Sequence, residues 1–269
     1  MQHDLLENIE LHTFTNPTRI DNPWLPLHPG KQLVFEGYTT EEDDAGIPQE
    51  IPHQVLFTAT DLTKVIAGIR CFVSYELDYS AGELVERELV FFAQDDDGTV
   101  WHLGQHPEAF EDGVLVEFPT WLHGLEKARA GIMMQAHPTV GTPSYSQGLG
   151  PAVDYTDRAQ IEEMGSTVVV TYGTFNDTLL IAESSEAEED AFQLKTYARG
   201  VGNIRVGFRG ADATHETLEL IDVIELDVAE LAEVRDVVLA LEAHAYTISK
   251  NSSLAYRTTT EMERVPPLL

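Results

Sequence analysis

The chain has little cysteine and little positive charge. Cys71 is the single cysteine among 269 residues, which excludes an internal disulfide and leaves nothing that marks an oxidising compartment. Lys and Arg together number 16 against 46 Asp and Glu, which gives a formal net charge of −30. Phosphates and anionic lipids require clustered cations, so this balance argues against nucleic acid and the membrane surface as partners.

Targeting and membrane-spanning patterns are also missing. The opening residues, MQHDLLENIELHTF, do not combine a basic region with an apolar run, as a signal peptide does. No segment approaches the ~20 apolar residues that a membrane-spanning helix needs. We therefore expect a cytoplasmic protein without a membrane partner, and a homo-oligomer remains open.

Catalytic and metal-binding signatures are scarce. The sequence has no Gly-x-Ser-x-Gly elbow, Walker loop, Rossmann glycine fingerprint or His-Glu-x-x-His motif. A zinc set could draw on His102, His106 or His123, but scattered polar histidines are the favoured interpretation, so no metal and no cofactor is expected. The run Asp95–Gly98 lacks the alternating spacing of an EF-hand loop and predicts a hairpin turn.

What the sequence does contain is a series of strand-like runs separated by short, turn-rich pieces such as EEDDAG, SAGE and DDDG. The connections are too short for helical crossovers, which favours antiparallel pairing. The predicted fold is mainly β, an antiparallel meander forming a barrel or a strongly curved sheet, closed by a C-terminal helix. The expected strands are 32–39, 54–60, 64–79, 84–94, 99–104, 114–118, 166–172, 178–183, 191–197, 204–208 and 216–226.

Three regions are expected along the chain. Residues 1–30 form an irregular, proline-rich lead-in whose Trp24, Leu25 and Leu27 pack on the body. Residues 31–250 form a single β-rich domain, in which the excursion 120–160 is a lid or pocket wall. Residues 251–269 form an extended tail.

The domain is expected to include a helix over 227–249. Asp227 caps it, and Glu230 follows three residues later, close to a capping-box pattern. Apolar residues recur at helical spacing and form one stripe that should be buried. The four residues expected to be buried are Leu231, Val234, Val238 and Leu241.

The candidate site lies in the segment ELVERELVFFAQDDDGTVWHLGQH, residues 83–106. An even-numbered turn at 80–83 pairs Leu77 with Glu86 and Tyr75 with Glu88, which places both Glu on a largely apolar, inward face. Buried carboxylates need partners or raised pKa values, so they tend to mark functional positions. A three-residue turn would instead turn both Glu toward solvent, and that alternative stays open.

Other residues are expected around these two carboxylates. A second even-numbered turn brings Gln94 near Trp101 on the same face as Tyr75. His102 follows on the same strand, and Trp121 and His123 begin the excursion that could cover the cavity. We predict that these six residues bind the ligand.

Two functions from different classes follow. The first is binding of a small, partly apolar molecule in the cavity of the curved sheet. The alternative is acid–base chemistry of the hydrolase, lyase or cyclase type in the same cavity, with Glu86 or Glu88 as the catalytic residue that moves the proton. A third interpretation is a structural or interaction protein whose sheet or helix stripe contacts another chain.

Four pieces of the chain carry a family resemblance: NPWLPLHPGKQLVFEG, ELVFFAQDDDGTVWHLG, GTFNDTLLIAE and YARGVGNIRVG. Together they resemble a family of bacterial, largely actinobacterial, β-rich proteins with no established activity, over most of residues 22–226. The resemblance implies a shared architecture centred on the FFAQD…GTVW hairpin. It transfers no catalytic residues.

Overall fold

The structure is a computed structural model that describes residues 7–42, 45–186, 188–248 and 256–264. Within these residues sixteen strands form one sheet, a 3-10 turn η1 (Ile9–Leu11) precedes them, and a long helix, α2 (Val228–Ala245), follows the last long strand. Successive long strands pair antiparallel, which confirms the predicted mainly β meander. No helix in these ranges is long and apolar enough to cross a membrane.

The first half of the sheet is a meander of long hairpins. Its strands are β1 (Lys31–Glu42), β2 (Pro48–Ile66), β3 (Ile69–Ser80), β4 (Glu83–Gln94), β5 (Val100–Glu111) and β6 (Val114–Glu117). The single strand predicted over 64–79 is wrong, because Ala67 and Gly68 both take positive φ values, 48° and 85°, and form the tight turn between β2 and β3. Two successive residues with positive φ are typical of the hairpin turns that match strand twist.

The second half continues the same sheet. Its strands are β11 (Arg158–Val170), β12 (Gly173–Ser184), β13 (Ala191–Ala198), β14 (Gly202–Gly210) and β15 (Thr217–Glu225). The two halves join where β15 pairs with β1. A short strand near the C-terminus, β16 (Glu263–Arg264), pairs with β2.

The excursion 120–160 carries short strands that connect the two outer edges of the sheet. These strands are β7 (Trp121–Leu122), β8 (Arg129–Met134), β9 (Tyr145–Ser146) and β10 (Gly148–Leu149). Both β7 and β8 pair with β5 at one edge, and β9 pairs with β11 at the other. β10 follows β9 after the single residue Gln147 and pairs back to β8. We call residues 145–149 the seam.

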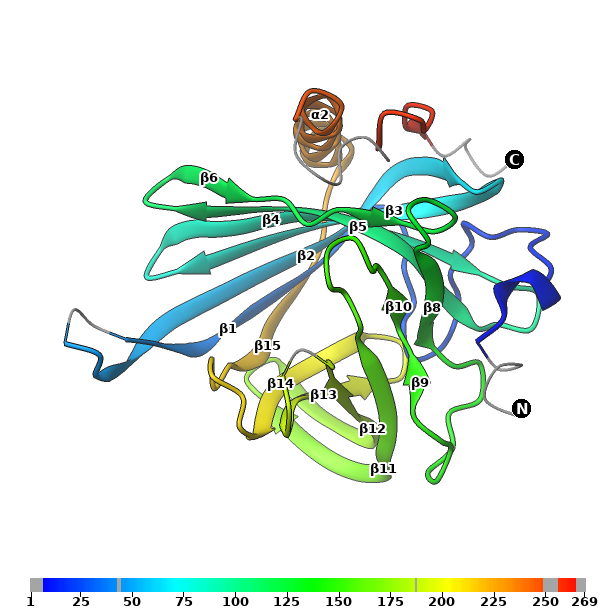
Figure 1. Ribbon diagram of the computed structural model, residues 1–269. Helices are drawn as coiled ribbons and strands as arrows, with labels where there is room; N and C mark the ends of the chain where they lie inside the picture. Colours follow the sequence, from blue (N-terminus) through cyan, green and yellow to red (C-terminus); the bar gives the residue numbers. More distant parts are fainter. Residues whose placement is uncertain (1–6, 43–44, 187, 249–255, 265–269) are drawn as a thin grey trace.

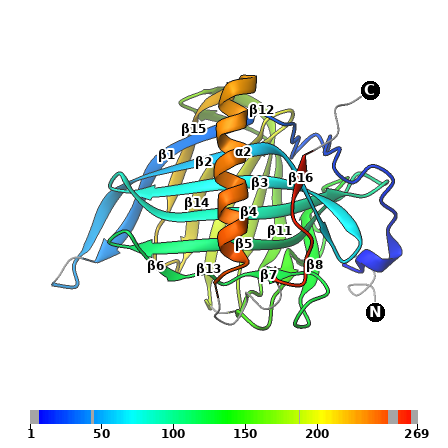
Figure 2. The same ribbon diagram turned by 90° about the horizontal axis from the view of Figure 1, so that it is seen from above.

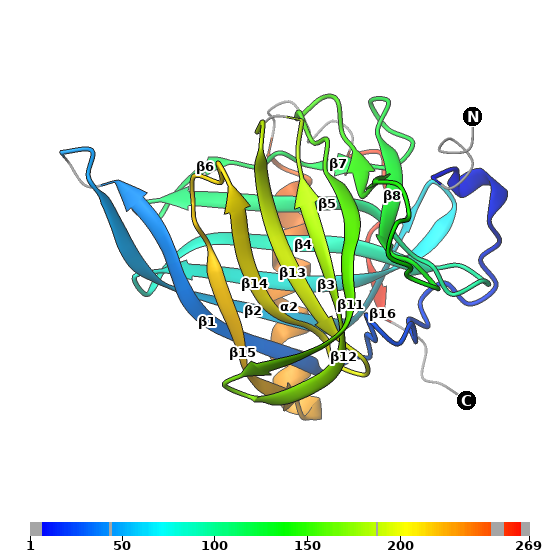
Figure 3. The same ribbon diagram turned by 90° about the horizontal axis from the view of Figure 1, so that it is seen from below.

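The resulting sheet is strongly curved but not closed, since among the described residues no ladder joins its two ends. Figure 1 shows β1–β6 in an upper layer and β11–β14 in a lower layer, with α2 outside the upper one. Seen from above, α2 crosses the strands of the first half, and seen from below, β11–β14 run beneath them (Figures 2 and 3). We call the face toward the opposite layer concave and the face toward α2 convex.

The helix begins as predicted. Asp227 accepts hydrogen bonds from the backbone of Ala229 and Glu230, and Glu230 completes a capping box. Of the four residues predicted to be buried, Val238 and Leu241 are buried and Leu231 and Val234 are only partly buried, so the stripe is confirmed for the second half of the helix. The helix ends at Ala245, before the predicted residue 249, which lies outside the described residues.

Ion pairs attach this helix to the convex face of the sheet. The pairs are Arg235–Asp61 at 2.6 Å, Lys64–Glu242 at 2.6 Å and His244–Glu108 at 2.5 Å. The side chains of Lys64 and Glu242 are 0% and 4% exposed, and burial lowers the pKa of Lys64. Removing one partner of a buried ion pair strongly destabilises a protein, because the other charge is left buried without a partner. The Lys64–Glu242 pair therefore fixes the position of the helix on the sheet.

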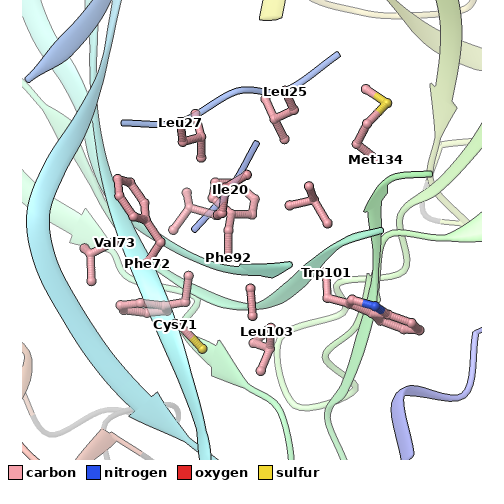
Figure 4. Packing of buried hydrophobic residues seen from close by; sticks show 14 of the residues in the cluster. Ile20, Leu25, Leu27, Cys71, Phe72, Val73, Phe92, Trp101, Leu103 and Met134 are labelled. Atoms are coloured by element: carbon pink, nitrogen blue, oxygen red, sulfur yellow. The ribbon is translucent and has the colours of Figure 1, made fainter. Parts of the chain in front are cut away.

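The lead-in packs against the core as predicted, with Trp24, Leu25 and Leu27 all buried. Ile20, Leu25 and Leu27 belong to the same apolar cluster as Phe92 and lie beside it in Figure 4. The lead-in therefore forms part of the wall on the concave side of the sheet.

Close packing at the seam generates a stability prediction. A Cβ atom on Gly131 of β8 would lie 2.2 Å from the backbone carbon of Gln147 and 2.2 Å from the nitrogen of Gly148. We expect Gly131→Ala to lower the free energy of unfolding by about 1–3 kcal/mol, the usual cost of overpacking. Urea denaturation of the variant and the original protein measures this difference in the free energy of unfolding.

The matched control is Gly207→Ala in β14, where an added Cβ meets no described atom within 4 Å. Its free energy of unfolding should stay within about 0.5 kcal/mol of the original, as for substitutions at unconstrained surface sites. Equal stability of the two variants would contradict the close packing at the seam.

Candidate functional site

The pairing of β3 with β4 determines where the predicted carboxylates point. The hairpin opens with Tyr79 opposite Leu84, as predicted. A β-bulge follows, in which β4 contributes one extra residue, Val85, between successive pairs. Every pair beyond the bulge is shifted by one residue from the predicted register, because the sequence carries no signal for the bulge.

Two carboxylate pairs result from this shift. Glu76 lies opposite Glu88, and Asp78 lies opposite Glu86, so all four share one face of the sheet. That face is concave, since Glu76 and Asp78 line the cavity between the two layers. Glu86 and Glu88 therefore point inward, as the sequence predicted, although toward other partners. We call the four residues the carboxylate quartet.

Burial raises the pKa values of the whole quartet. Burial raises the pKa of Glu76 to about 7; the charge of Lys195 opposes this rise, and Glu86 and Asp78 add to it. Burial also raises the pKa of Asp78 to about 7, against the opposing charge of His53. Burial also raises the pKa of Glu86, and burial together with Glu86 and Glu76 raises that of Glu88. Like charges directly opposite each other on a sheet destabilise it, so the arrangement costs stability.

The quartet has few hydrogen-bond donors within reach. Among the described residues, Glu76, Glu86 and Glu88 make no hydrogen bond or ion pair. Asp78 Oδ1 lies 3.3 Å from His53 Nδ1, but this buried oxygen accepts no hydrogen bond there. Buried acceptors without donors are rare in folded proteins and call for an explanation.

A cavity of about 270 Å³ lies beside the quartet, between the two layers. One part of its wall is apolar and comes from the lead-in and from strands of both halves: Leu25, Leu27, Leu33, Phe35, Val55, Phe57, Phe92, Met133, Val206 and Leu218. The other part is polar and includes Glu76, Asp78, Glu216 and Lys195. The cavity wall therefore combines apolar and polar side chains, and Val55 and Phe57 lie directly opposite Asp78 and Glu76 across the β2–β3 ladder.

Lys195 of β13 is held by a network that reaches the seam. Its Nζ lies 2.7 Å from Glu183 Oε2, and Glu183 Oε1 accepts a 2.7 Å hydrogen bond from Gln147 Nε2. Burial alone would lower the pKa of Lys195, but the adjacent Glu183 outweighs it and raises that pKa. The ammonium group stays charged and is ion-paired with Glu183.

His53 of β2 forms a second polar cluster at the cavity. Its Nε2 lies 2.9 Å from Glu216 Oε1, and Gln193 also donates to Glu216. Burial would lower the pKa of His53, but the hydrogen bond to Glu216 and the charge of Asp78 raise it. His53 thus couples the quartet to the second half of the sheet.

None of the eight residues predicted for the site lines this cavity. Tyr75 lies opposite Leu89, on the convex face, where burial raises its pKa to about 12 and Arg87 and Glu108 are neighbours. On the same face, Arg87 donates to Glu108. The single bulge accounts for the position of Tyr75 on this face.

Gln94 and Trp101 have structural contacts and do not meet. Gln94 accepts hydrogen bonds from the backbone of Asp21 and Asn22 and so anchors the lead-in. Trp101 is fully buried, and its indole N–H donates to Asp95 at 2.9 Å. Gln94 pairs with Val100, so the predicted proximity of Gln94 and Trp101 is wrong.

His102 and Trp121 do come together, with Tyr155, near the seam. The ring centroids of His102 and Trp121 lie 4.8 Å apart, and those of Trp121 and Tyr155 lie 4.9 Å apart. The ring nitrogens of His102 lie 3.0 Å from the Gln147 carbonyl oxygen and 3.1 Å from that of Gly104. Burial lowers the pKa of His102 to about 4, while the contacts with the carbonyl oxygens of Gln147 and Gly104 act to raise it. The ring links the first half of the sheet to the seam.

The three histidines of the metal alternative do not converge. A bulge between Phe91 and Phe92 shifts the β4–β5 register, so His102 faces the concave side and His106 the convex side. His106 contacts Thr120 Oγ1 at 2.6 Å, and His123 Nδ1 accepts a hydrogen bond from the backbone of Ala130. Within the described ranges, no group of three His, Cys, Asp or Glu could hold a metal ion.

The second half of the sheet contributes site residues that no local pattern in the sequence indicates. Lys195, Glu183 and Glu216 lie on strands far from the predicted segment, and only the pairing of β15 with β1 brings them to the quartet. One weak signal existed for Lys195, since it is a scarce lysine in the otherwise uncharged strand AFQLKTYA.

Comparisons with known proteins give limited similarity. No protein-family model matches the chain, and no curated protein matches it. A structure described as an exported protein with a YmcC-like fold from Bacteroides fragilis is 11% identical, with 74% of this chain and 98% of that chain covered and a TM-score of 0.42. A structure described as a lipoprotein from Parabacteroides distasonis is also 11% identical, with 76% and 99% covered and a TM-score of 0.37.

These similarities are too low to carry an argument about function. The cytoplasmic location expected from the N-terminal residues has no support from structures described as an exported protein and a lipoprotein, and we withdraw it without assigning a location to this chain.

The raised pKa values predict how stability depends on pH. In the unfolded chain Glu76 and Asp78 titrate near 4.5 and 3.8, and in the folded protein near 7, so between these values the folded state binds more protons. Their contribution to stability is therefore complete at pH values below the unfolded pKa and lost as the pH rises through about 7. We expect the Glu76→Gln, Asp78→Asn double variant to lose less stability than the original protein between pH 5 and pH 8.

Chemical denaturation at several pH values measures this difference. A shift of one pKa unit corresponds to about 1.4 kcal/mol, so the gap between the two curves should change by more than about 1 kcal/mol over the window. Glu117→Gln, which removes an exposed carboxylate on β6, should give a curve parallel to that of the original protein. A parallel curve for the double variant would contradict the raised pKa values.

Proposed function

We propose that the protein binds a small, partly apolar molecule in the cavity between the two layers of the sheet. The observation that carries this proposal is that the cavity wall is mostly apolar and includes a few polar and charged side chains. Ligand pockets are typically apolar concavities in which a few polar groups fix the orientation of the ligand.

The volume of the cavity limits the ligand to a small molecule. About 270 Å³ is close to the lower end of the usual range of ligand pockets, and it equals the volume of about nine water molecules. Phe35, Val55 and Leu218 would contact the apolar body of the ligand. Its polar group would lie toward Glu76 and Asp78.

A second candidate function is acid–base catalysis in the same cavity. The observation that favours it is that the Glu76 and Asp78 carboxyl groups have pKa values near 7. A group with a pKa near the working pH can both accept and donate a proton, which suits general acid–base chemistry. Glu86 and Glu88 lie directly across the β3–β4 ladder and would hold the exchanged protons.

Ligand binding can be tested by filling the cavity. We expect apolar small molecules that bind in the cavity to raise the melting temperature as their concentration increases. At 100 times the Kd, binding adds about 2.7 kcal/mol to the free energy of unfolding. Val55→Phe places a larger side chain at the cavity wall and should abolish this stabilisation. Thermal-shift measurements, confirmed by native mass spectrometry, provide the readout.

The control is Val169→Phe, which makes the same change at a side chain that is 62% exposed. It should keep the ligand-induced shift unchanged. An equal response of both variants to the same molecules would place any binding elsewhere and overturn the proposal.

A further inference from the structure

The cationic side chains in and beside the cavity wall already form ion pairs or hydrogen bonds within the protein. Lys195 is paired with Glu183 at 2.7 Å, and His53 with Glu216 at 2.9 Å. Lys31 is buried, and its Nζ donates to two backbone carbonyl oxygens, those of Val201 at 2.7 Å and Pro26 at 3.2 Å. None of these groups offers a free positive charge to an anionic ligand.

The carboxylates at the cavity are in the opposite situation. Glu76 accepts no side-chain hydrogen bond from the described residues, and the buried Oδ1 atom of Asp78 accepts none either, although His53 Nδ1 lies 3.3 Å from it. Glu88 and Glu86 lie directly across the β3–β4 ladder, and burial raises the pKa values of all four carboxyl groups. As Glu76 and Asp78 ionise near pH 7, this part of the cavity gains negative charge that Lys195, already paired with Glu183, offsets only in part.

A further unpaired polar group lies in the interior, outside the cavity lining. Tyr145 of the seam is 0% exposed, and its hydroxyl group has no hydrogen-bond partner among the described residues. Burial raises its pKa, and the two groups that raise it further are Tyr197, which lines the cavity, and Glu183, the partner of Lys195. Buried polar groups without partners are rare, and the one that lines the cavity, Asp78 Oδ1, points to a polar ligand group that this chain does not supply.

We propose that the ligand is a small amine, an apolar body that carries one protonated nitrogen, and that this nitrogen donates to Glu76 and Asp78. The inference rests on the proposed binding function and adds the chemical class of the ligand. An ammonium group offers up to three N–H donors and a positive charge, which matches the two acceptors and the excess negative charge. A carboxylate-bearing molecule of the same shape would be repelled by Glu76 and Asp78 once they ionise, and the charge of Lys195 is already paired with Glu183.

The experiment compares three molecules that share one apolar chain: hexylamine, 1-hexanol and hexanoate. Titration calorimetry of the full chain at pH 7.5 should show hexylamine binding at least tenfold more tightly than 1-hexanol, and hexanoate binding most weakly. The affinity for hexylamine should also rise between pH 6 and pH 8, because Glu76 and Asp78 ionise there while the amine stays protonated. This pH series needs no variant, so it holds even if a substitution disturbs folding.

Two variants localise the effect. Glu76→Gln and Asp78→Asn should each weaken hexylamine binding at least tenfold and change 1-hexanol binding by less than threefold. The matched control, Glu117→Gln, removes one negative charge from the exposed strand β6, so it separates a local contact from the general field of an acidic protein. It should leave all three affinities unchanged.

The outcomes separate this inference from the proposed function. If 1-hexanol or hexanoate binds as tightly as hexylamine, or if Glu117→Gln weakens hexylamine binding as much as Glu76→Gln, the amine inference is overturned while binding in the cavity stands. If none of the three molecules binds, both the inference and the proposed function fail for ligands of this size.

Discussion

The interior of this protein depends on the two edges of one sheet being held together at Gln147. The side chain of this residue donates to Glu183 on the second half, and its carbonyl oxygen contacts the His102 ring on the first half. Twisted sheets of many strands tend to curl, and the seam holds the curled form by joining β9 to β10 through one residue. Without that link the concave face would be one side of an open sheet, exposed to water.

Enclosure gives the carboxylates of the concave face their unusual chemistry. On an open sheet, paired glutamates would be hydrated and would ionise at their ordinary pKa. Between two layers, Glu76 and Glu88 lose part of that hydration, so burial and mutual repulsion both favour the protonated form. The local sequence thus conflicts with the stability of the sheet, and such conflicts in natural proteins concentrate at functional or strained positions.

The strand order of the first half could be predicted from turn chemistry, because short pieces rich in Asp and Gly leave room only for antiparallel hairpins. The register within those hairpins could not be predicted, since the extra residue at Val85 is neither a glycine nor part of a turn motif. That one residue moved Tyr75 to the convex face and brought Asp78 into the site. The inward direction of Glu86 and Glu88 was nevertheless predicted, because it depends on the alternation of side chains along β4.

The second half of the site was beyond prediction from one sequence. Lys195 and Glu216 reach the quartet only through the pairing of β1 with β15, strands separated by most of the chain. The seam strands contain two residues each, too few to show any periodicity. Side-chain direction in such segments depends on tertiary contacts, which local sequence does not encode.

The same long-range pairing has a consequence for how the chain folds. β1 is made early in synthesis, but its second partner, β15, is among the last strands to be made, and Lys64 meets Glu242 across 178 residues of chain. During translation the first meander therefore carries an unpaired edge at β1, and Lys64 lacks its counter-ion. Contacts between distant segments slow folding, and open strand edges invite association with other chains. The strong negative charge of the chain opposes such association by mutual repulsion, and so protects the growing chain before its last strand and helix arrive.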